Sequence, residues 1–179
     1  MQKDEKTPIN QLMGSMAIVL SVILFIPLGF NIIAIRTRVS VGGGGIGMSA
    51  SRRTGENAFD IINMGDVDNN WLDLIGTFSI VLMALCGFLF VYGIMLFAKG
   101  ESRLLQRLYR PITLVASGIA IAIGVFALMF MREFEATEWG IVGVGMEVSA
   151  TITGGMILLF VVGGIGVLQA LFLGRRSKK

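Results

Sequence analysis

The side chains that come closest to forming an ion site in this sequence are Asp66, Asp68 and Asn70. Oxygen ligands at alternate positions open the Ca²⁺-binding loop of an EF-hand, because they can converge on one cation. The sixth position of that loop is here Trp71 instead of glycine, and no glutamate stands at the twelfth. The pattern therefore allows only a loose divalent-cation site. We prefer a second interpretation, in which these residues cap the start of a helix and Trp71 anchors it at a membrane interface.

Other residue types that carry chemistry are scarce. The sequence has no histidine, which removes the commonest ligand of haem and transition metals, and it has one cysteine, Cys86, which excludes an internal disulfide. The glycine run at 42–45 lacks the Lys-Ser/Thr pair of a phosphate-binding loop. We find no nucleophile beside a base, and we expect no enzymatic activity and no cofactor.

The elements that position these residues are four long apolar stretches. The chain is 54% hydrophobic, with a mean hydropathy of +0.78. Stretches without charged residues cover about 12–35, 74–98, 111–131 and 148–174. Each is long enough, at 1.5 Å per residue, to cross a hydrocarbon core about 30 Å thick. The sequence therefore predicts one all-α membrane domain, residues 1–179, built as a four-transmembrane-helix bundle.

Charged residues predict the orientation of this bundle. Ten basic residues flank the spans on the side of both chain ends, and five lie in the outer loops 36–73 and 132–147. By the positive-inside rule, both termini are cytoplasmic and the protein lies in the cell membrane. Nine of the twelve acidic residues fall in the outer loops, so the outer side has a net charge of −4 and the inner side +7. The outer acidic surface includes Glu133, Glu135 and Glu138, and it would attract cations.

The two outer loops contain residues that alternate in the manner of strands. Val39 and Val41 precede the glycine run, and Met48 and Ala50 follow it. This pattern predicts a β-hairpin, and the segment 58–62 could add another strand. The second loop alternates from 142 to 148, which predicts a strand that joins the hairpin in a small extracellular sheet. The alternative is that these glycine-rich runs are flexible.

Basic residues on the inner side are expected to contact lipid headgroups. Arg103, Arg107 and Arg110 share one face of a helical segment before Pro111, while leucines occupy another face. Such a segment would lie at the lipid interface and end where Pro111 starts the third span. Arg175 and Arg176 follow the fourth span. A specific lipid or partner site is one interpretation, and generic anchoring by long basic side chains is the other.

Small residues line one face of the third and of the fourth span. They step by three or four positions, so each set forms a stripe along its helix. Such stripes let helix backbones approach closely, which favours packing of spans three and four within the chain or, alternatively, an interface between chains. The residues are Ala116, Ala120 and Gly124, followed by Gly155, Gly163, Gly166 and Ala170.

The layout resembles that of claudin-type tetraspan proteins. The resemblance consists of four spans with both ends inside, a longer strand-bearing first outer loop, and a second loop that runs from Trp139 through Gly155 into a glycine-rich span. The Gly-Leu-Trp motif and the disulfide pair of the claudin first loop are absent. The resemblance therefore implies a shared architecture and carries over no functional residue.

Two functions fit these features. The first is a non-enzymatic membrane protein that self-assembles or serves as an accessory or structural subunit of a membrane complex. Its partners would be the bilayer and other membrane subunits or further copies of itself, with no role for nucleic acid. The alternative is an oligomeric cation-selective channel with an acidic outer vestibule. Because the spans hold no carboxylate or arginine at mid-membrane, a coupled transporter is disfavoured.

Overall fold

The computed structural model describes residues 6–42, 47–63, 70–99, 103–134, 138–141 and 144–176. The elements follow one another as α1 (Lys6–Phe25), the 3-10 helix η1 (Ile26–Gly29), β1 (Ile33–Gly42), β2 (Gly47–Glu56), α2 (Ala58–Asn63), α3 (Asn70–Lys99), α4 (Arg103–Phe134), β3 (Glu138–Ile141), β4 (Val144–Ile152) and α5 (Gly154–Arg176).

Four helical segments are long and apolar enough to cross a membrane, which confirms the four-span prediction by length and composition. These segments are Gln11–Gly29, Asn70–Ala98, Arg107–Glu133 and Gly154–Phe172. Large apolar side chains such as Phe88, Leu168 and Phe172 are exposed on the outside of the bundle. An exposed apolar surface of this extent suits contact with lipid, because water would penalise it.

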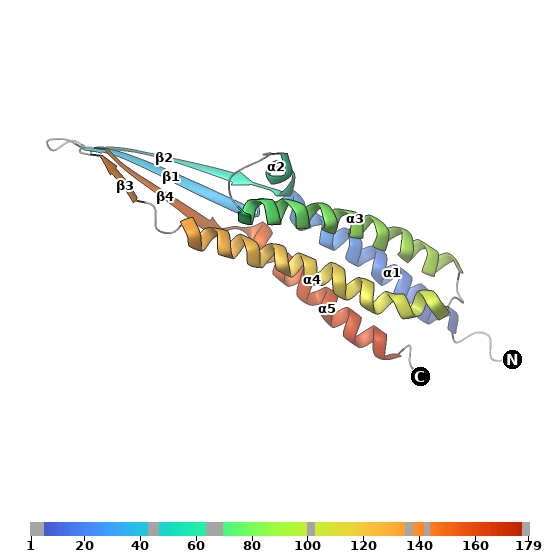
Figure 1. Cartoon of the computed structure of the whole chain (residues 1–179). Helices are drawn as coiled ribbons and strands as arrows, with labels where there is room; N and C mark the ends of the chain where they lie inside the picture. The colour runs from blue at the N-terminus through green and yellow to red at the C-terminus, as the bar shows by residue number, and fades with distance from the viewer. Residues whose placement is uncertain are drawn as a thin grey trace.

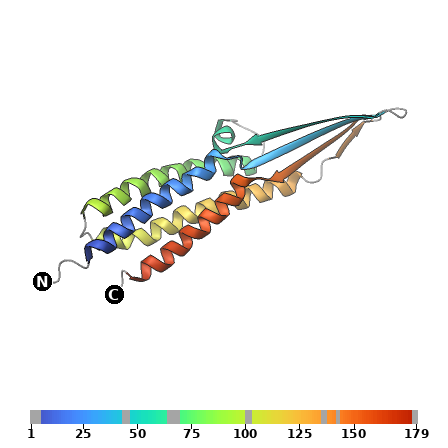
Figure 2. The ribbon, with the colours of Figure 1, turned by 180° about the vertical axis from the view of Figure 1, so that it is seen from behind.

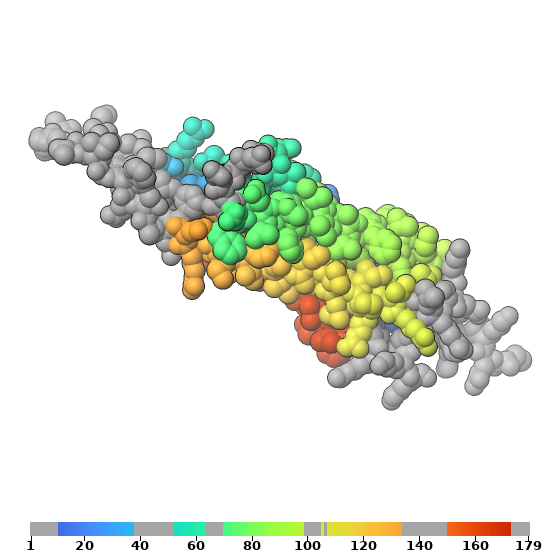
Figure 3. Space-filling view, viewed as in Figure 1, coloured from blue at the N-terminus to red at the C-terminus, as the bar shows by residue number. Residues whose placement is uncertain are grey.

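The long helices pack as an elongated bundle with the sheet at one end. α1 lies along α3, α4 lies along α5, and α3 and α4 contact each other. α3 and α4 form one continuous surface along the bundle in the view of Figure 3. α1 begins and α5 ends at the same end of the bundle, whereas the strands extend from the opposite end (Figures 1 and 2).

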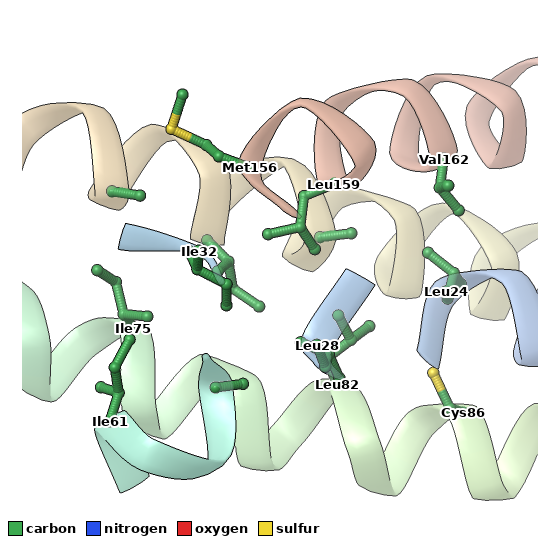
Figure 4. Packing of buried hydrophobic residues seen from close by; sticks show 14 of the residues in the cluster. Leu24, Leu28, Ile32, Ile61, Ile75, Leu82, Cys86, Met156, Leu159 and Val162 are labelled. Atoms are coloured by element: carbon green, nitrogen blue, oxygen red, sulfur yellow. The ribbon is translucent and has the colours of Figure 1, made fainter. Parts of the chain in front are cut away.

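The main core extends from the middle of the bundle to its junction with the sheet. Leu28 of η1, Leu82 of α3 and Leu159 of α5 are fully buried in this core (Figure 4). Ile61 of α2 and Ile75 of α3 extend the same cluster. A second, smaller cluster near the other end of the bundle contains Met13, Ala17, Tyr92, Leu96 and Tyr109.

The strands form one antiparallel sheet in the order β2-β1-β4-β3. β1 and β2 pair as a hairpin, from Ile33 opposite Glu56 to Gly42 opposite Gly47. β4 pairs with the other side of β1, so strands from the two predicted loops share a sheet. The hairpin prediction and the joining of the second loop to it are both confirmed.

The ends of two predicted spans belong to this sheet. The first span was expected to reach residue 35, but β1 already begins at Ile33. The fourth was expected to begin at residue 148, but β4 continues to Ile152. A buried strand and a buried helix are both continuously apolar, so hydropathy cannot locate the boundary between them.

The strand suggested for residues 58–62 is wrong, because this segment forms helix α2. Asn57 caps the helix: its Oδ1 accepts hydrogen bonds from the backbone N–H groups of Phe59 and Asp60, at 2.9 and 3.0 Å. Asp60 Oδ2 accepts in return from the backbone N–H of Asn57, at 3.1 Å. This reciprocal arrangement is a capping box, which marks the start of α2.

Two prolines lie at the ends of helices or within them. α1 ends at Phe25 and Pro27 lies in η1, where its carbonyl accepts from the N–H of Phe30 at 3.2 Å. Pro111 was expected to end an interfacial helix, but α4 runs through it. Proline has no backbone N–H, so the carbonyl of Arg107, four residues before Pro111, has no hydrogen-bond partner in the helix. Arg107 is exposed, and water or headgroups can bind this carbonyl.

Candidate functional site

The small residues predicted in the third and fourth spans lie at the contact between α4 and α5. Ala116, Ala120 and Ala170 are fully buried. A Cβ atom added to Gly163 would lie 2.6 Å from Cγ1 of Ile121, and one added to Gly124 would lie 2.8 Å from Cζ of Phe160. These distances leave no space for a methyl group, so the two helices touch through glycine at these positions.

Gly166 and Gly155 are also at close contacts. A Cβ at Gly166 would collide with Oγ of Ser117 on α4. A Cβ at Gly155 would lie 2.5 Å from the carbonyl oxygen of Asn31, so this glycine lets the start of α5 approach the segment that leads into β1. All the small residues named from the sequence are therefore buried within this one chain.

A glycine contact between α1 and α3 was missed by the sequence analysis. A Cβ at Gly14 would lie 2.8 Å from the carbonyl oxygen of Gly93, and one at Gly93 would lie 2.9 Å from that of Gly14. The two backbones therefore meet directly. Large residues stand three and four positions before and after Gly93, so no stripe indicated an interface on α3, whereas Gly14, Ala17 and Ser21 form a short stripe of small residues on α1 that could have indicated one.

Buried polar groups lie inside the bundle. Gln169 of α5 donates a hydrogen bond from Nε2 to the hydroxyl of Tyr109 on α4, and the hydroxyl of Tyr92 donates to the carbonyl oxygen of Leu105. The hydroxyls of Ser79 and Ser117 are fully buried and have no partner within the described part of the chain. The two hydrogen bonds tie α4 to α5 and to α3, and the described polar groups include no nucleophile beside a base, which suits a structural role.

The weak cation site cannot be assembled from the described residues. Asp66 and Asp68 lie outside them, and Asn70 is the exposed first residue of α3. Within the ranges that the structure describes, no three histidine, cysteine or acidic residues come together as metal ligands would. Asn70 at the helix start matches the position expected of a capping segment.

The charged residues lie at opposite ends of the bundle. Glu133 is exposed near the end of α4 that adjoins the sheet, and Glu138 begins β3, while Glu135 lies outside the described residues. At the other end, Arg103 begins α4, Arg107 is exposed and Arg110 is half-buried. Arg175 and Arg176 close α5 at that same end.

Strand pairing aligns the residues of the sheet in rows across its four strands. Two rows toward the tip consist only of apolar residue types: Met48, Val41, Val144 and Ile141, then Ala50, Val39, Met146 and Trp139. The rows between and beside them contain polar residue types and glycine: Ser49, Ser40, Gly145 and Gly140, then Ser51, Arg38, Glu147 and Glu138.

Fold and sequence together define the class: a chain with four helices fit to cross a membrane and a small antiparallel sheet at one end of their bundle. Neither a family model nor a curated protein matches this chain. Of the predicted claudin-type layout, the structure shows the four long apolar helices and the antiparallel sheet.

Proposed function

We propose that this protein is a non-enzymatic integral membrane protein that acts by self-assembly or as an accessory or structural subunit of a membrane complex. In this proposal it lies in the cell membrane with both termini in the cytoplasm, and its sheet stands on the outer side as in the claudin-type layout. The side that carries the basic residues Arg107 and Arg110 then meets the inner headgroups.

The observation that carries the proposal is the contrast between the packed interior of the bundle and the sheet that protrudes from it. The helices meet at close contacts at Gly14, Gly93 and Gly163 and enclose a core of buried apolar side chains. The sheet instead extends away from the helices, where other proteins can reach it (Figure 1). A closed interior and a protruding sheet favour binding over chemistry.

Purification from the membrane tests this proposal. A tagged full-length chain extracted in mild detergent is expected to elute as a homo-oligomer or with a partner in fixed stoichiometry, as measured by native mass spectrometry. A strictly monomeric chain without partners, both in detergent and after cross-linking in the native membrane, would contradict the proposal.

The channel alternative has a separate test. Its support is the acidic outer surface, of which Glu133 is exposed beside the sheet. The purified chain would be reconstituted in planar bilayers, and we expect no conductance. A reproducible cation conductance that is lost when Glu133, Glu135 and Glu138 are all changed to glutamine would favour the channel and overturn the passive role.

A further inference from the structure

The base of the sheet carries two arginines side by side on one face. Arg36 of β1 and Arg53 of β2 are partners in the strand register, and both are exposed. Directly opposite residues of antiparallel strands point to the same face, with Cβ atoms about 5 Å apart. The neighbouring Ile35 packs against the main core, so the two arginines point away from that core.

Neither arginine has an ion-pair partner among the described residues. Glu56 is the one acidic residue of β1 and β2, and the register places it on the other face. In β4, Ser149 is level with Arg36, and Glu147 is level with Arg38, nearer the tip. Like charges directly across a strand pair repel each other. An anion bound between the two guanidinium groups would remove this repulsion.

Exposed apolar residues mark the edge of the lipid-facing surface just below the arginine pair. Ile152, which is level with Ile33 at the base of the sheet, is 59% exposed. Phe59 of α2 is also exposed, and its ring meets that of Phe25, at the end of α1, edge to face with the centroids 6.3 Å apart. These side chains suit contact with lipid tails, because water would penalise their exposure.

The arginine pair lies a short distance beyond this apolar edge. Arg36 is three residues from Ile33, which is about 10 Å at 3.3 Å per residue. The headgroup region on each side of the hydrocarbon core is about 5–8 Å thick. Because a long arginine side chain can extend back toward the membrane, the pair is within reach of the lipid phosphates.

We propose that Arg36 and Arg53 bind the phosphate of a phospholipid in the leaflet on the sheet side of the membrane. The inference rests on the membrane location given in the proposed function, and it adds a ligand and the residues that bind it. Guanidinium groups suit this ligand, because their paired N–H donors match the spacing of phosphate oxygens. A lipid brings its phosphate to the height of the pair while its tails contact the exposed apolar surface of the bundle, which a free phosphate cannot do.

Lipid binding by the purified full-length chain tests the inference. The chain is kept in a detergent without phosphate, a short-chain phosphatidylglycerol is titrated, and native mass spectrometry counts the bound lipid. We expect Arg53→Gln to weaken this binding about fivefold, which is the effect of one arginine at a lipid surface. The matched control is Arg52→Gln, because Arg52 is the next residue of the same strand and is exposed on the opposite face. This control should bind lipid as the parent does, and equal losses in both variants would overturn the paired site.

Two further ligands identify the part of the lipid that is bound. Glycerol phosphate has the phosphate without the tails, and diacylglycerol has the tails without the phosphate. We expect neither compound to displace the phospholipid at equal concentration. Displacement by glycerol phosphate would assign the arginines to a soluble anion, and displacement by diacylglycerol would leave them without a role. Either result would overturn the inference.

Thermal unfolding provides a second measurement, based on the repulsion between the two arginines. Without phospholipid, Arg53→Gln should unfold at the same temperature as the parent or at a higher one, because it removes a like-charge pair. With saturating phospholipid the order should reverse, because the parent gains more binding free energy. A variant that is less stable than the parent in both conditions, by the same amount, would contradict the inference.

These outcomes are independent of the test of the proposed function. A chain that binds phospholipid through Arg53 but is always monomeric and without partners would support this inference and contradict the proposed function. An oligomer whose variants all bind phospholipid equally would do the reverse.

Discussion

Single glycines set the distance between helices in this bundle. Gly14 and Gly93 lie against each other's backbone, and Gly163 lies against Ile121 and the carbonyl oxygen of Ser117. Lipid tails are as apolar as the helix surfaces, so the hydrophobic effect does not favour contact between helices in a membrane. The quality of van der Waals packing therefore matters more there than it does in water. A backbone atom cannot move aside as a flexible side chain can, which makes Gly14 the most sensitive of these positions.

The substitution Gly14→Ala is therefore expected to destabilise the bundle. Its Cβ would lie 2.8 Å from both the carbonyl oxygen of Gly93 and the backbone nitrogen of Phe97. We expect a loss of about 1–3 kcal/mol in the free energy of unfolding, as in other overpacked cores. Unfolding of the purified protein in detergent, followed by circular dichroism, measures the loss.

The control for this prediction is Gly87→Ala on α3, where the added Cβ meets no atom within 4 Å. Alanine has the higher helix propensity, so this variant should be as stable as the parent or slightly more stable. If both substitutions had the same effect, the Gly14–Gly93 contact would not be the reason for glycine at position 14.

The junctions between strands and helices hold the elements in place. Thr153 lies between β4 and α5 and is buried. Its hydroxyl donates to the carbonyl oxygen of Ile32 at 2.7 Å, and it accepts from the backbone N–H of Met156 at 3.4 Å. One side chain thus caps α5 and fastens the base of the sheet to the segment before β1.

Replacing Thr153 by valine keeps the shape of the side chain but removes both hydrogen bonds. We expect a loss of about 1–2 kcal/mol in the free energy of unfolding, because the N–H of Met156 and the carbonyl of Ile32 lose a buried partner. Thr153→Ser retains the hydroxyl and should recover most of the loss. Detergent unfolding of both variants measures the difference, and a valine variant as stable as the parent would show that the two hydrogen bonds do not contribute.

The whole molecule is polarised along its long axis. The sheet extends from one end of the bundle, and the exposed Arg107 lies toward the other. An even number of spans places the start of α1 and the end of α5 on the same side of a membrane, in agreement with their position in Figure 1. The bundle can therefore have only one of two orientations in a membrane, and one experiment can distinguish them.

Labelling of single cysteines in intact cells measures this orientation. In a Cys86→Ala background, Arg53→Cys on the sheet should react with a membrane-impermeant maleimide, whereas Arg107→Cys should be protected until the cells are permeabilised. Both parent side chains are exposed, so access to the residue itself is not limiting. The opposite pattern would reverse the predicted topology. Asn57 is a poorer site for this test, because its side chain caps α2.

The sequence alone was sufficient for the parts of the fold that depend on local pattern. Four uninterrupted apolar stretches predicted four spans, and alternation around the glycine run at 42–45 predicted the hairpin. It was insufficient where two structures share one pattern. Residues 58–62 form a short, mostly apolar run that suits a strand as well as a helix, but the capping box of Asn57 and Asp60 starts a helix there. Ile33 and Ile152 lie in strands, but the sequence assigned them to spans because each continues an apolar stretch.

What the sequence determined by itself was the number of apolar spans, the uneven distribution of charge and the near absence of reactive groups, since each of these is a property of composition along the chain. Only the tertiary structure decided which glycines touch, because Gly14 meets Gly93 across two helices that are distant in sequence. It also decided that β4 lies beside β1, which aligns Val39 with Met146 and Trp139 in one row of the sheet. Register between strands from separate loops depends on long-range pairing, which no local pattern encodes.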